Sequence, residues 1–315
     1  MLTYDRDAVA RRLPYDRLID ALEKAFQSNV VAPERAHHQL KVPGSADATL
    51  LVMPAWRSGE ALGVKIATIF PGNVRQGLPS VSASYLLLDP NTGQPIALLD
   101  GAELTLRRTA AASALASKYL SREDASTMLM VGTGRLAPHL IAAHATARDL
   151  DEVIIWGRRP EAAAELAGSL APASFTATPA ADLAAAVDRA DIISCATLAT
   201  EPMIKGEWLH CGQHLDLVGA FRADMSEADV EALLRADVYV DTFAGALAEA
   251  GEIVQALQAG RFERSDIVGD LAGLVRGTCR SRERADAITL FKSVGTALED
   301  LAAAELATTA DMGHD

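Results

Sequence analysis

The feature that most constrains the fold is an apolar strand that runs into a glycine turn and then a helix, within MLMVGTGRLAPHL (residues 128–140). In a dinucleotide-binding turn of the form Gly-x-Gly-x-x-Ala, the first glycine permits a tight turn and the second lets the backbone approach a pyrophosphate. The small third residue lets the helix pack closely, and the N–H groups of its first turn face the phosphates. The pattern therefore predicts a dinucleotide site, with a purely structural turn as the alternative. Its residues are Gly132, Thr133, Gly134, Arg135, Leu136 and Ala137.

Short apolar strands alternate with helices throughout the part of the chain that follows residue 120. The segments that read as strands are STMLMVG, DEVIIWG, DIISCAT, HLDLVGA and DVYVDT. Strands that alternate with helices of about 10–15 residues are typical of a parallel sheet. We therefore predict a Rossmann-type, dinucleotide-binding domain over residues 121–289.

The first 120 residues follow a different rhythm. Apolar residues recur at helical spacing from Tyr15 to Ser28, and the Ala-rich segment 101–120 also favours a helix. Between them lie β-like runs punctuated by Gly and Pro, which indicate an antiparallel or mixed sheet. The stretch ITLFKSVGTALEDLAAAELA (288–307) reads as a long helix, so residues 290–315 are predicted to complete the first domain, 1–120. The predicted fold class is α/β, with a Rossmann-type parallel-sheet domain and an α+β domain.

The residues after the second strand of the α/β half point to the cofactor. EVIIWG is followed by Arg158 and Arg159, where an NAD-preferring enzyme usually carries an acidic residue for the ribose hydroxyls. Guanidinium groups would instead pair with the 2′-phosphate of NADP. The sequence therefore predicts NADPH as the cofactor, with NADH as the alternative. The alternative is that these arginines have no ligand and only begin a solvent-exposed helix.

Charge and composition exclude several classes of partner. A formal charge of −13 disfavours nucleic acid. Cys195, Cys211 and Cys279 have no metal-ligand spacing, so no metal site is predicted, and of the histidines only His37 and His38 are kept as pocket candidates. No apolar run approaches the ~18 residues of a membrane span, and the N-terminus reads as an amphipathic helix rather than a signal peptide. We expect a cytoplasmic protein without a membrane partner.

Six blocks spread along nearly the whole chain make the sequence resemble the ornithine cyclodeaminase and mu-crystallin family. The resemblance implies a homodimer with a substrate-binding and dimerising domain, built from the N-terminal part and the C-terminal helix, and a Rossmann domain between them. The blocks are VMPAW (52–56), GVKIATIFPGN (63–73), LLDGAELTLRRTAAASALASKYL (98–120), VGTGRLA (131–137), LATEPMIKGEW (198–208) and FKSVGTALED (291–300).

The resemblance also implies roles for residues of a substrate pocket. Lys65 looks like the active-site lysine of the family, Arg108 like its carboxylate-binding arginine, and Arg35 like a second arginine of the same pocket. Met53 and Phe221 are expected to line it. The chemistry agrees, because a carboxylate suits the planar fork of an arginine and a lysine beside an imine carbon can orient or protonate the imine.

Further cofactor contacts are expected where strands end. Ligands of doubly wound sheets lie at the carboxyl ends of the strands. Thr197 and Leu198 close the strand DIISCATLAT, Val218 and Gly219 close HLDLVG, and both pairs are expected beside the nicotinamide and its ribose. Lys292-Ser293-Val294-Gly295 resembles another family segment that lies near the cofactor. The resemblance implies that Ser293 and Gly295 contact the cofactor. The alternative is that this segment is only the start of a helix.

One departure from the family pattern bears on the activity. The cyclodeaminases of the family carry an aspartate shortly after the strand-end glycine, and it takes part in deamination. Here VGAFRADMSEAD places Phe221 at that position, and a phenyl ring cannot act as an acid or base. Asp224 is predicted to cap the helix that follows instead.

Cyclic ketimine reduction is therefore the predicted activity. The protein is expected to be an NAD(P)H-dependent oxidoreductase acting on C–N bonds in proline metabolism. It would reduce Δ1-pyrroline-2-carboxylate or Δ1-piperideine-2-carboxylate to proline or pipecolate. The alternatives are ornithine cyclodeamination, amino-acid dehydrogenation of the alanine type, and a crystallin-like protein that binds NADPH and a ligand without turnover.

Overall fold

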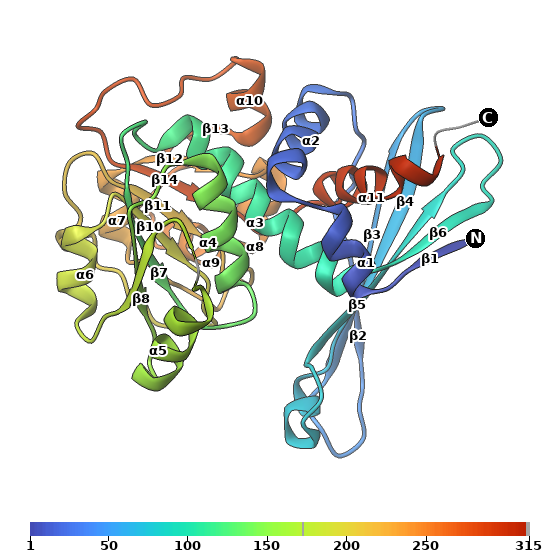
Figure 1. Cartoon of the computed structure of the whole chain (residues 1–315), viewed down its shortest axis with the longest axis horizontal. Helices are drawn as coiled ribbons and strands as arrows, with labels where there is room; N and C mark the ends of the chain where they lie inside the picture. The colour runs from blue at the N-terminus through green and yellow to red at the C-terminus, as the bar shows by residue number, and fades with distance from the viewer. Residues whose placement is uncertain (172, 313–315) are drawn as a thin grey trace. The chain divides into compact units, whose positions relative to one another are not determined.

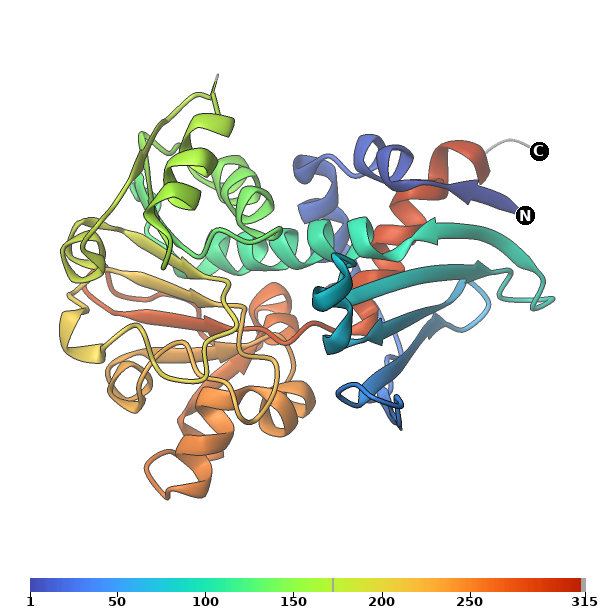
Figure 2. The same ribbon diagram turned by 90° about the horizontal axis from the view of Figure 1, so that it is seen from below.

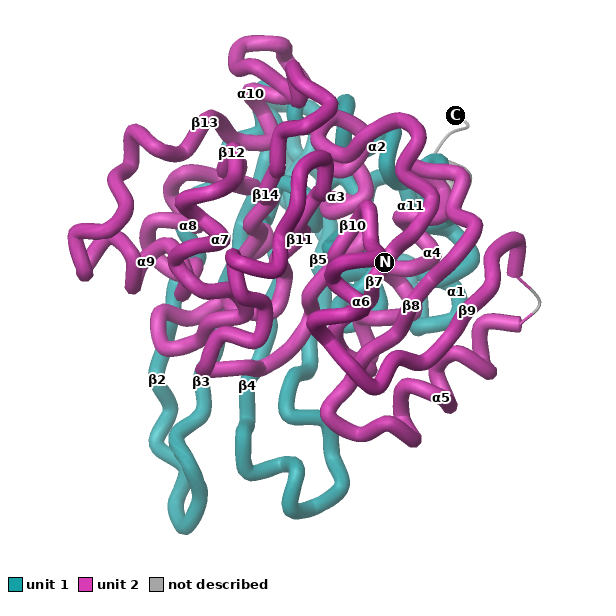
Figure 3. The backbone as a smooth tube through the Cα atoms, turned by 90° about the vertical axis from the view of Figure 1, so that its left-hand side faces the viewer, with its two compact units in different colours: residues 1–109, 296–315 teal, residues 110–295 magenta. Residues whose placement is uncertain are grey.

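The computed structural model describes residues 1–171 and 173–312 (Figure 1). Within this part the chain forms two compact units, Met1–Thr109 with Thr296–Asp315 and Ala110–Gly295, coloured separately in Figure 3. Residue 172 and residues 313–315, which fall in the predicted ranges 121–289 and 290–315, lie outside the described residues. The boundary between the units falls inside helix α3 (Gly101–Leu120), whereas the sequence places the domain boundary where this helix ends.

The first unit is built on a mixed sheet. Its strands follow the order β1-β6-β5-β4-β3-β2, with β1 parallel to β6 and the other neighbours antiparallel. Of the two predicted arrangements, antiparallel or mixed, the sheet has the mixed one. Strands β1 and β2 and the break between α1 and α2 were not predicted. The elements, with the first half of α3, are β1 (Leu2–Tyr4), α1 (Arg6–Arg12), α2 (Tyr15–Gln27), β2 (Ala36–Leu40), β3 (Ala48–Arg57), β4 (Ala61–Ile69), η1 (Pro71–Gln76), β5 (Val81–Leu88), β6 (Pro95–Asp100) and α11 (Ala297–Met312).

Helix α11 covers one face of this sheet. Along β4 the buried residues are Ala61, Gly63, Lys65 and Ala67, and they alternate with more exposed neighbours. This alternation follows from the strand geometry, in which successive side chains point to opposite faces. An ion pair between Lys65 and Asp300 of α11 identifies the buried face as the one on which the helix lies.

The second unit contains a parallel sheet in the order β13-β12-β14-β11-β10-β7-β8-β9. In Figure 2 α4 and α5 lie on one face of this sheet and α8 and α9 on the other, which confirms the predicted Rossmann-type architecture. The elements are β7 (Thr127–Val131), α4 (Ala137–Ala147), β8 (Glu152–Trp156), α5 (Pro160–Ser169), β9 (Thr176–Pro179), α6 (Leu183–Arg189), β10 (Ile192–Cys195), η2 (Gly206–Trp208), β11 (His214–Leu217), α7 (Val230–Arg235), β12 (Asp237–Val240), α8 (Phe243–Glu249), α9 (Gly251–Gln258), η3 (Arg264–Asp266), β13 (Ile267–Asp270), α10 (Leu271–Arg276) and β14 (Thr289–Lys292).

The long C-terminal helix predicted over 288–307 is wrong in its first part. Thr289–Lys292 form strand β14, which pairs with β11 and β12 in the interior of the sheet, and α11 begins only at Ala297. All four residues of β14 are buried, because a strand inside a parallel sheet is covered on both faces. Its sequence therefore shows no alternation of polar and apolar residues, and by its pattern it cannot be distinguished from a buried helix. The part of the chain that the structure describes contains no helix with the length and apolar character needed to cross a membrane.

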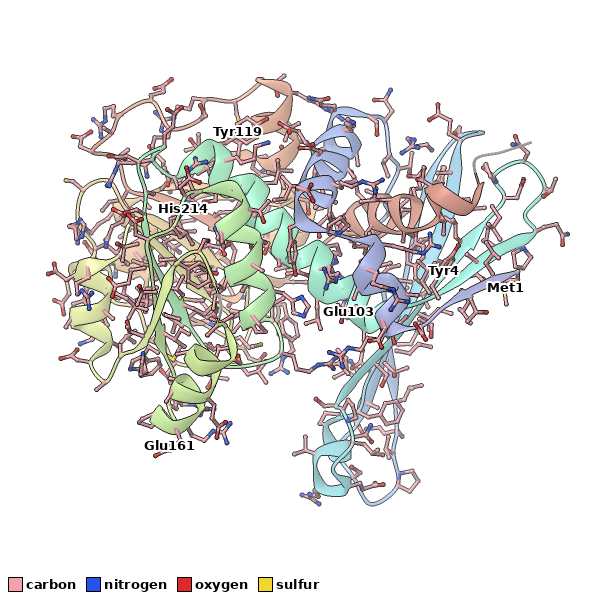
Figure 4. The ribbon with its side chains drawn as sticks, viewed as in Figure 1. Met1, Tyr4, Glu103, Tyr119, Glu161 and His214 are labelled. Carbon is pink, nitrogen blue, oxygen red and sulfur yellow. The ribbon has the colours of Figure 1, made fainter. Side chains whose placement is uncertain are left out.

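Buried polar side chains connect helices and strands in the core of the second unit. The carboxylate of Asp216 accepts hydrogen bonds from Ser113 Oγ at 2.9 Å and Ser194 Oγ at 2.6 Å. His214, labelled in Figure 4, lies on the same strand, and its Nδ1 is 2.9 Å from Thr289 Oγ1. Thr289 Oγ1 donates its proton to the carbonyl of Leu120, so Nδ1 of His214 is the donor in this contact. His214 therefore carries a proton on Nδ1.

Burial makes His214 a source of pH-dependent stability. It lowers the pKa of His214 to about 3, from 6.5. The unfolded chain binds this proton below about pH 6.5, whereas the folded chain binds it only below about pH 3. The contribution of His214 to the free energy of unfolding is therefore fully present above pH 6.5 and is lost as the pH falls toward 3. One such group changes the unfolding free energy by about 1.4 kcal/mol per pH unit. We expect His214→Asn, whose amide can replace the Nδ1 donor, to reduce that slope in denaturant titrations between pH 6 and 4, taken as approximate limits. The control His210→Asn, at an exposed position, should leave the slope as in the wild type, and an unchanged slope in His214→Asn would contradict the assignment.

Candidate functional site

The glycine turn lies at the carboxyl end of β7, whose neighbours in the sheet are β8 and β10. The strand order reverses direction at this point, which is where open α/β sheets bind ligands. Gly132 has a φ of 119°, and a Cβ atom there would lie 2.6 Å from the carbonyl oxygen of Ala196, so a side chain is excluded. Gly134 differs, because no atom lies within 4 Å of its ideal Cβ position. The backbone at Gly134 is open to a ligand, and this opening fits a pyrophosphate.

The remaining residues of the turn agree with this arrangement. Ala137, fully buried, is the first residue of α4, which has no side-chain cap at its N-terminus. Arg135 is exposed, and Leu136 and Thr133 are half-buried. The uncapped N–H groups of α4 therefore suit an anion.

The end of β8 lies against the glycine turn. A Cβ atom on Gly157 would come within 2.8 Å of Thr133 Cγ2, so these two loops are in direct contact. Arg158 and Arg159 follow Gly157, and both are exposed. Arg159 precedes the first residue of α5 without capping it through its side chain. The two guanidinium groups thus belong to the same edge of the sheet as the turn.

Two further strand ends are held together by one carboxylate. Thr197 and Leu198 follow β10, and Val218 and Gly219 follow β11. The buried Glu227 accepts hydrogen bonds from Thr197 N at 2.7 Å, from Thr197 Oγ1 at 2.9 Å and from Gly219 N at 2.6 Å. Leu198 is 76% exposed, so it is available to a ligand. The structure brings these predicted residues together at adjacent strands.

The segment after β14 is fixed by a second carboxylate. Asp241 accepts hydrogen bonds from Val294 N at 2.8 Å and Gly295 N at 2.6 Å. Ser293 is buried, and its hydroxyl has no hydrogen-bond partner among residues 1–171 and 173–312. Gly295 has a φ of 82°, a conformation that favours glycine. The predicted contacts Ser293 and Gly295 therefore lie in a loop that is hydrogen-bonded to Asp241, and the helix that follows begins only at Ala297.

A buried charge cluster occupies the first unit. Lys65 is 3% exposed, and its Nζ lies 2.9 Å from Asp300 Oδ1 and 2.8 Å from Asp300 Oδ2. Arg108 is 4% exposed, and it donates from Nε to Asp300 Oδ1 at 2.8 Å and from Nη1 to Glu299 Oε2 at 2.7 Å. Two cations and two carboxylates balance one another, which makes their common burial tolerable.

The cluster changes the acidity of its members. Burial lowers the pKa of Lys65 to about 8, with the positive charge of Arg108 acting in the same direction and Asp300 opposing both. Burial by itself would raise the pKa of Asp300, but Arg108 and Lys65 outweigh it and hold that pKa below its ordinary value. Lys65 therefore keeps its proton at neutral pH and can release it more readily than an exposed lysine.

The other predicted pocket residues of the first unit lie near this cluster. Met53 is buried and pairs directly with Lys65 across β3 and β4. Arg35 is half-buried, and its charge contributes to the lowered pKa of Lys65. His37 and His38 are exposed on β2. The described residues contain no group of three or more His, Cys, Asp or Glu that could hold a metal ion.

Phe221 and Asp224 belong to the second unit. The ring of Phe221 is half-buried and packs against the hydrophobic core of the second unit. The prediction that Asp224 caps the next helix is wrong. The carboxylate of Asp224 binds Arg222 through two hydrogen bonds of 2.9 Å, and Asp229 caps α7 instead. Asp229 lies directly before the helix, where its side chain can reach the N–H of Ala232.

Sequence reasoning missed the buried carboxylates of both units. Asp300 and Glu299 lie within the block FKSVGTALED, which was noted only as part of the family resemblance. Asp241 lies at the end of the segment DVYVDT, which reads as a strand, and Glu227 and Glu252 lie in segments for which no role was predicted. Nothing in their local sequence separates them from exposed acids, because their partners are distant in the chain.

Comparison with known proteins gives consistent matches over the whole chain. The model of the ornithine cyclodeaminase/mu-crystallin family matches residues 2–310. The Δ1-pyrroline-2-carboxylate reductase of Colwellia psychrerythraea is 37% identical over 302 residues, which are 95% of this chain and 95% of the relative. The structure of Thermococcus litoralis Δ1-pyrroline-2-carboxylate reductase in complex with NADH and L-proline has a TM-score of 0.92 at 33% identity, covering 98% of this chain and 97% of that one. An archaeal alanine dehydrogenase dimer with bound NAD has a TM-score of 0.91 at 28% identity, covering 100% and 98%.

Proposed function

The chain belongs to the ornithine cyclodeaminase/mu-crystallin family, and we propose that it is an NAD(P)H-dependent oxidoreductase that reduces the C=N bond of a cyclic ketimine 2-carboxylate. The substrate is Δ1-pyrroline-2-carboxylate or Δ1-piperideine-2-carboxylate, and the product is proline or pipecolate. The observation that carries the proposal is the buried cluster of Lys65, Arg108 and Asp300, which joins a proton donor to a carboxylate-binding group. The relatives that reduce pyrroline-2-carboxylate support the choice of substrate.

Lys65 is the proton donor in this proposal. A bound nicotinamide dinucleotide supplies the hydride that adds to the imine carbon. The ring nitrogen must gain a proton as the C=N double bond becomes a single bond, and the ammonium group of Lys65 provides it. Asp300 holds this group through both carboxylate oxygens, at 2.9 Å and 2.8 Å. A pKa of about 8 matches the task, because a general acid works best when its pKa lies near the operating pH.

Arg108 is proposed to bind the carboxylate of the substrate. Its Nε and Nη1 are engaged by Asp300 and Glu299, whereas its Nη2 makes no hydrogen bond within the described part of the chain. The two carboxylates fix the plane of the guanidinium group, so its remaining donors point in a set direction. Arg35 is the second cation of this pocket, and Met53 lines it.

The role of Phe221 favours reduction over cyclodeamination. Deamination needs a group at this place that can move a proton or orient water, and a phenyl ring can do neither. We propose that Phe221 forms an apolar wall against the methylene groups of the substrate ring. One methylene more or less in such a pocket changes selectivity by only about 1–3 kcal/mol, so both ring sizes are retained in the proposal.

The proposed cofactor is NADPH, and Arg158 and Arg159 are the proposed contacts to its 2′-phosphate. We expect the double variant Arg158→Ala/Arg159→Ala to lower kcat/KM for NADPH about 10- to 100-fold, since each charge-assisted hydrogen bond to a phosphate contributes about 1.5–3 kcal/mol when shielded and less at an exposed position. The value for NADH should stay within about threefold. Initial rates with both cofactors measure this. The exposed Arg189→Ala serves as the matched control, and an equal loss with both cofactors would refute the assignment.

The first unit is proposed to bind substrate and to form a homodimer, and the second to bind the dinucleotide. The face of the first sheet opposite α11 is apolar, and Ile66 on this face is 45% exposed. A sheet face of this composition is typical of a protein interface. Further apolar residues on this face include Leu50, Val52, Trp56, Leu62, Val64 and Leu86. The unpaired cysteines agree with the reducing cytoplasm as the proposed location.

Steady-state kinetics test the function. We expect purified protein to oxidise NADPH when given either cyclic imine, and to release no ammonia from ornithine. Faster oxidation with pyruvate and ammonia would favour an alanine-type dehydrogenase. Binding of NADPH without turnover on any of these substrates would favour a crystallin-like binding protein.

A further inference from the structure

Glu227 makes an unusual set of contacts for a loop carboxylate. It is 0% exposed and lies in the connection between β11 and α7. Its Oε1 accepts from both the backbone N and the hydroxyl of Thr197, and its Oε2 accepts from the backbone N of Gly219. One side chain thus joins the loops that follow two adjacent strands, β10 and β11.

Glu227 is itself held in place by a further buried pair. Its backbone N donates to Glu252 Oε1 at 2.8 Å, and Glu252 Oε2 lies 3.3 Å from the ammonium group of Lys292. Lys292 is the last residue of β14, the strand next to β11. The network therefore reaches three strand ends on one edge of the sheet.

Fold stability alone is a poor explanation for these charges. Removing a carboxylate from water is costly, and an apolar side chain would close the same space with less penalty. Burial raises the pKa of Glu227, and Lys292 only partly offsets this effect. Asp216 gives a contrast in the same sheet, because it accepts its hydrogen bonds from two side chains of the core, Ser113 and Ser194. A buried charge directed at backbone N–H groups of two loops instead fixes the path of those loops.

We infer that Glu227 is a positioning residue for the nicotinamide end of the cofactor. By holding Thr197 and Gly219, it sets the backbone and the exposed Leu198 in the arrangement that receives the ring and its ribose. This inference rests on the proposed function, since it assumes that a nicotinamide dinucleotide binds at these strand ends. It adds a residue to the site that touches neither cofactor nor substrate and acts through two others.

The test is the isosteric variant Glu227→Gln. Its amide keeps one acceptor oxygen but turns an NH2 group toward a backbone N–H, so one loop loses its anchor. We expect the dissociation constant for NADPH, measured by calorimetry without substrate, to rise at least about tenfold. The KM for the cyclic imine should stay within about threefold. Unchanged cofactor affinity, with or without a lower melting temperature, would overturn the inference.

Two further proteins keep the result interpretable. The control Asp216→Asn removes a carboxylate that is as buried as that of Glu227. It should lower the melting temperature without changing the affinity for NADPH. An equal loss of affinity in this control would show that the effect of Glu227→Gln is unspecific, and would overturn the inference. If Glu227→Gln does not fold, Thr197→Val removes one of the three hydrogen bonds at constant shape. It should weaken NADPH binding about threefold, and an unchanged constant would again overturn the inference. A wild-type protein that binds no dinucleotide would remove the proposed function, whereas normal binding in Glu227→Gln would remove only this inference.

Discussion

Replacing Lys65 with methionine is expected to lower kcat for imine reduction about 10²- to 10⁴-fold, which is the range that a positioned general acid contributes to the rate. Methionine keeps most of the length of the side chain and loses its proton. Asp300 retains its hydrogen bond of 2.8 Å from Arg108, but one buried positive charge is lost, so the variant should also have a lower melting temperature. Affinity for NADPH should stay within about twofold of the wild type. Steady-state rates and calorimetry on the same preparation measure both quantities.

The pH profile gives the same prediction a second signature. The proton of Lys65 is lost as the pH rises through about 8, so the wild-type rate should fall on the alkaline side of that value. Lys41→Met is the matched control, since Lys41 lies in the same unit and its side chain is 91% exposed. Turnover by Lys65→Met within about tenfold of the wild type would exclude lysine as the proton donor.

Replacing Gly134 with valine is expected to weaken dinucleotide binding at least about 100-fold, which corresponds to about 2.8 kcal/mol. The ideal Cβ of Gly134 has no neighbour within 4 Å, so the protein itself has room for the side chain. The added atoms fill the opening through which the pyrophosphate approaches the backbone. The melting temperature should therefore change little while binding is lost. Calorimetry with NADPH and NADH, together with thermal unfolding, measures the two effects separately.

Gly168 provides the control for this variant. It also has no atom within 4 Å of its ideal Cβ position, but it lies near the end of α5. Gly168→Val should bind dinucleotide as the wild type does. Undiminished binding by Gly134→Val would show that the cofactor does not use the turn.

Local patterns were sufficient to predict most of the architecture and part of the site. The turn around Gly132 was predictable because its function needs glycine at fixed spacing next to a strand and a helix. The sheet of the first unit was predictable from β-like runs between turn signals. Lys65 and Arg108 were different, because their local sequence resembles that of any exposed charge, and only the family resemblance singled them out.

The remainder depends on contacts between distant parts of the chain. Glu227 meets Thr197 across 30 residues, and Lys65 meets Asp300 across 235. Neither separation leaves a local pattern. The sequence of strand β14 also fits a helix, for a related reason. Elements far away in sequence cover both faces of the strand, so it lacks the alternation of buried and exposed residues that identifies a strand.

Transfer of a deuterium label tests the central claim most directly. The protein would be given Δ1-pyrroline-2-carboxylate and NADPH deuterated at C4 of the nicotinamide on both faces, and the proline formed would be examined by mass spectrometry and NMR. The account predicts one deuterium per molecule of proline, bound to the carbon that carries the carboxylate, in equal amount to the cofactor oxidised. Proline without the label, or no proline at all from a protein that binds NADPH, would contradict it.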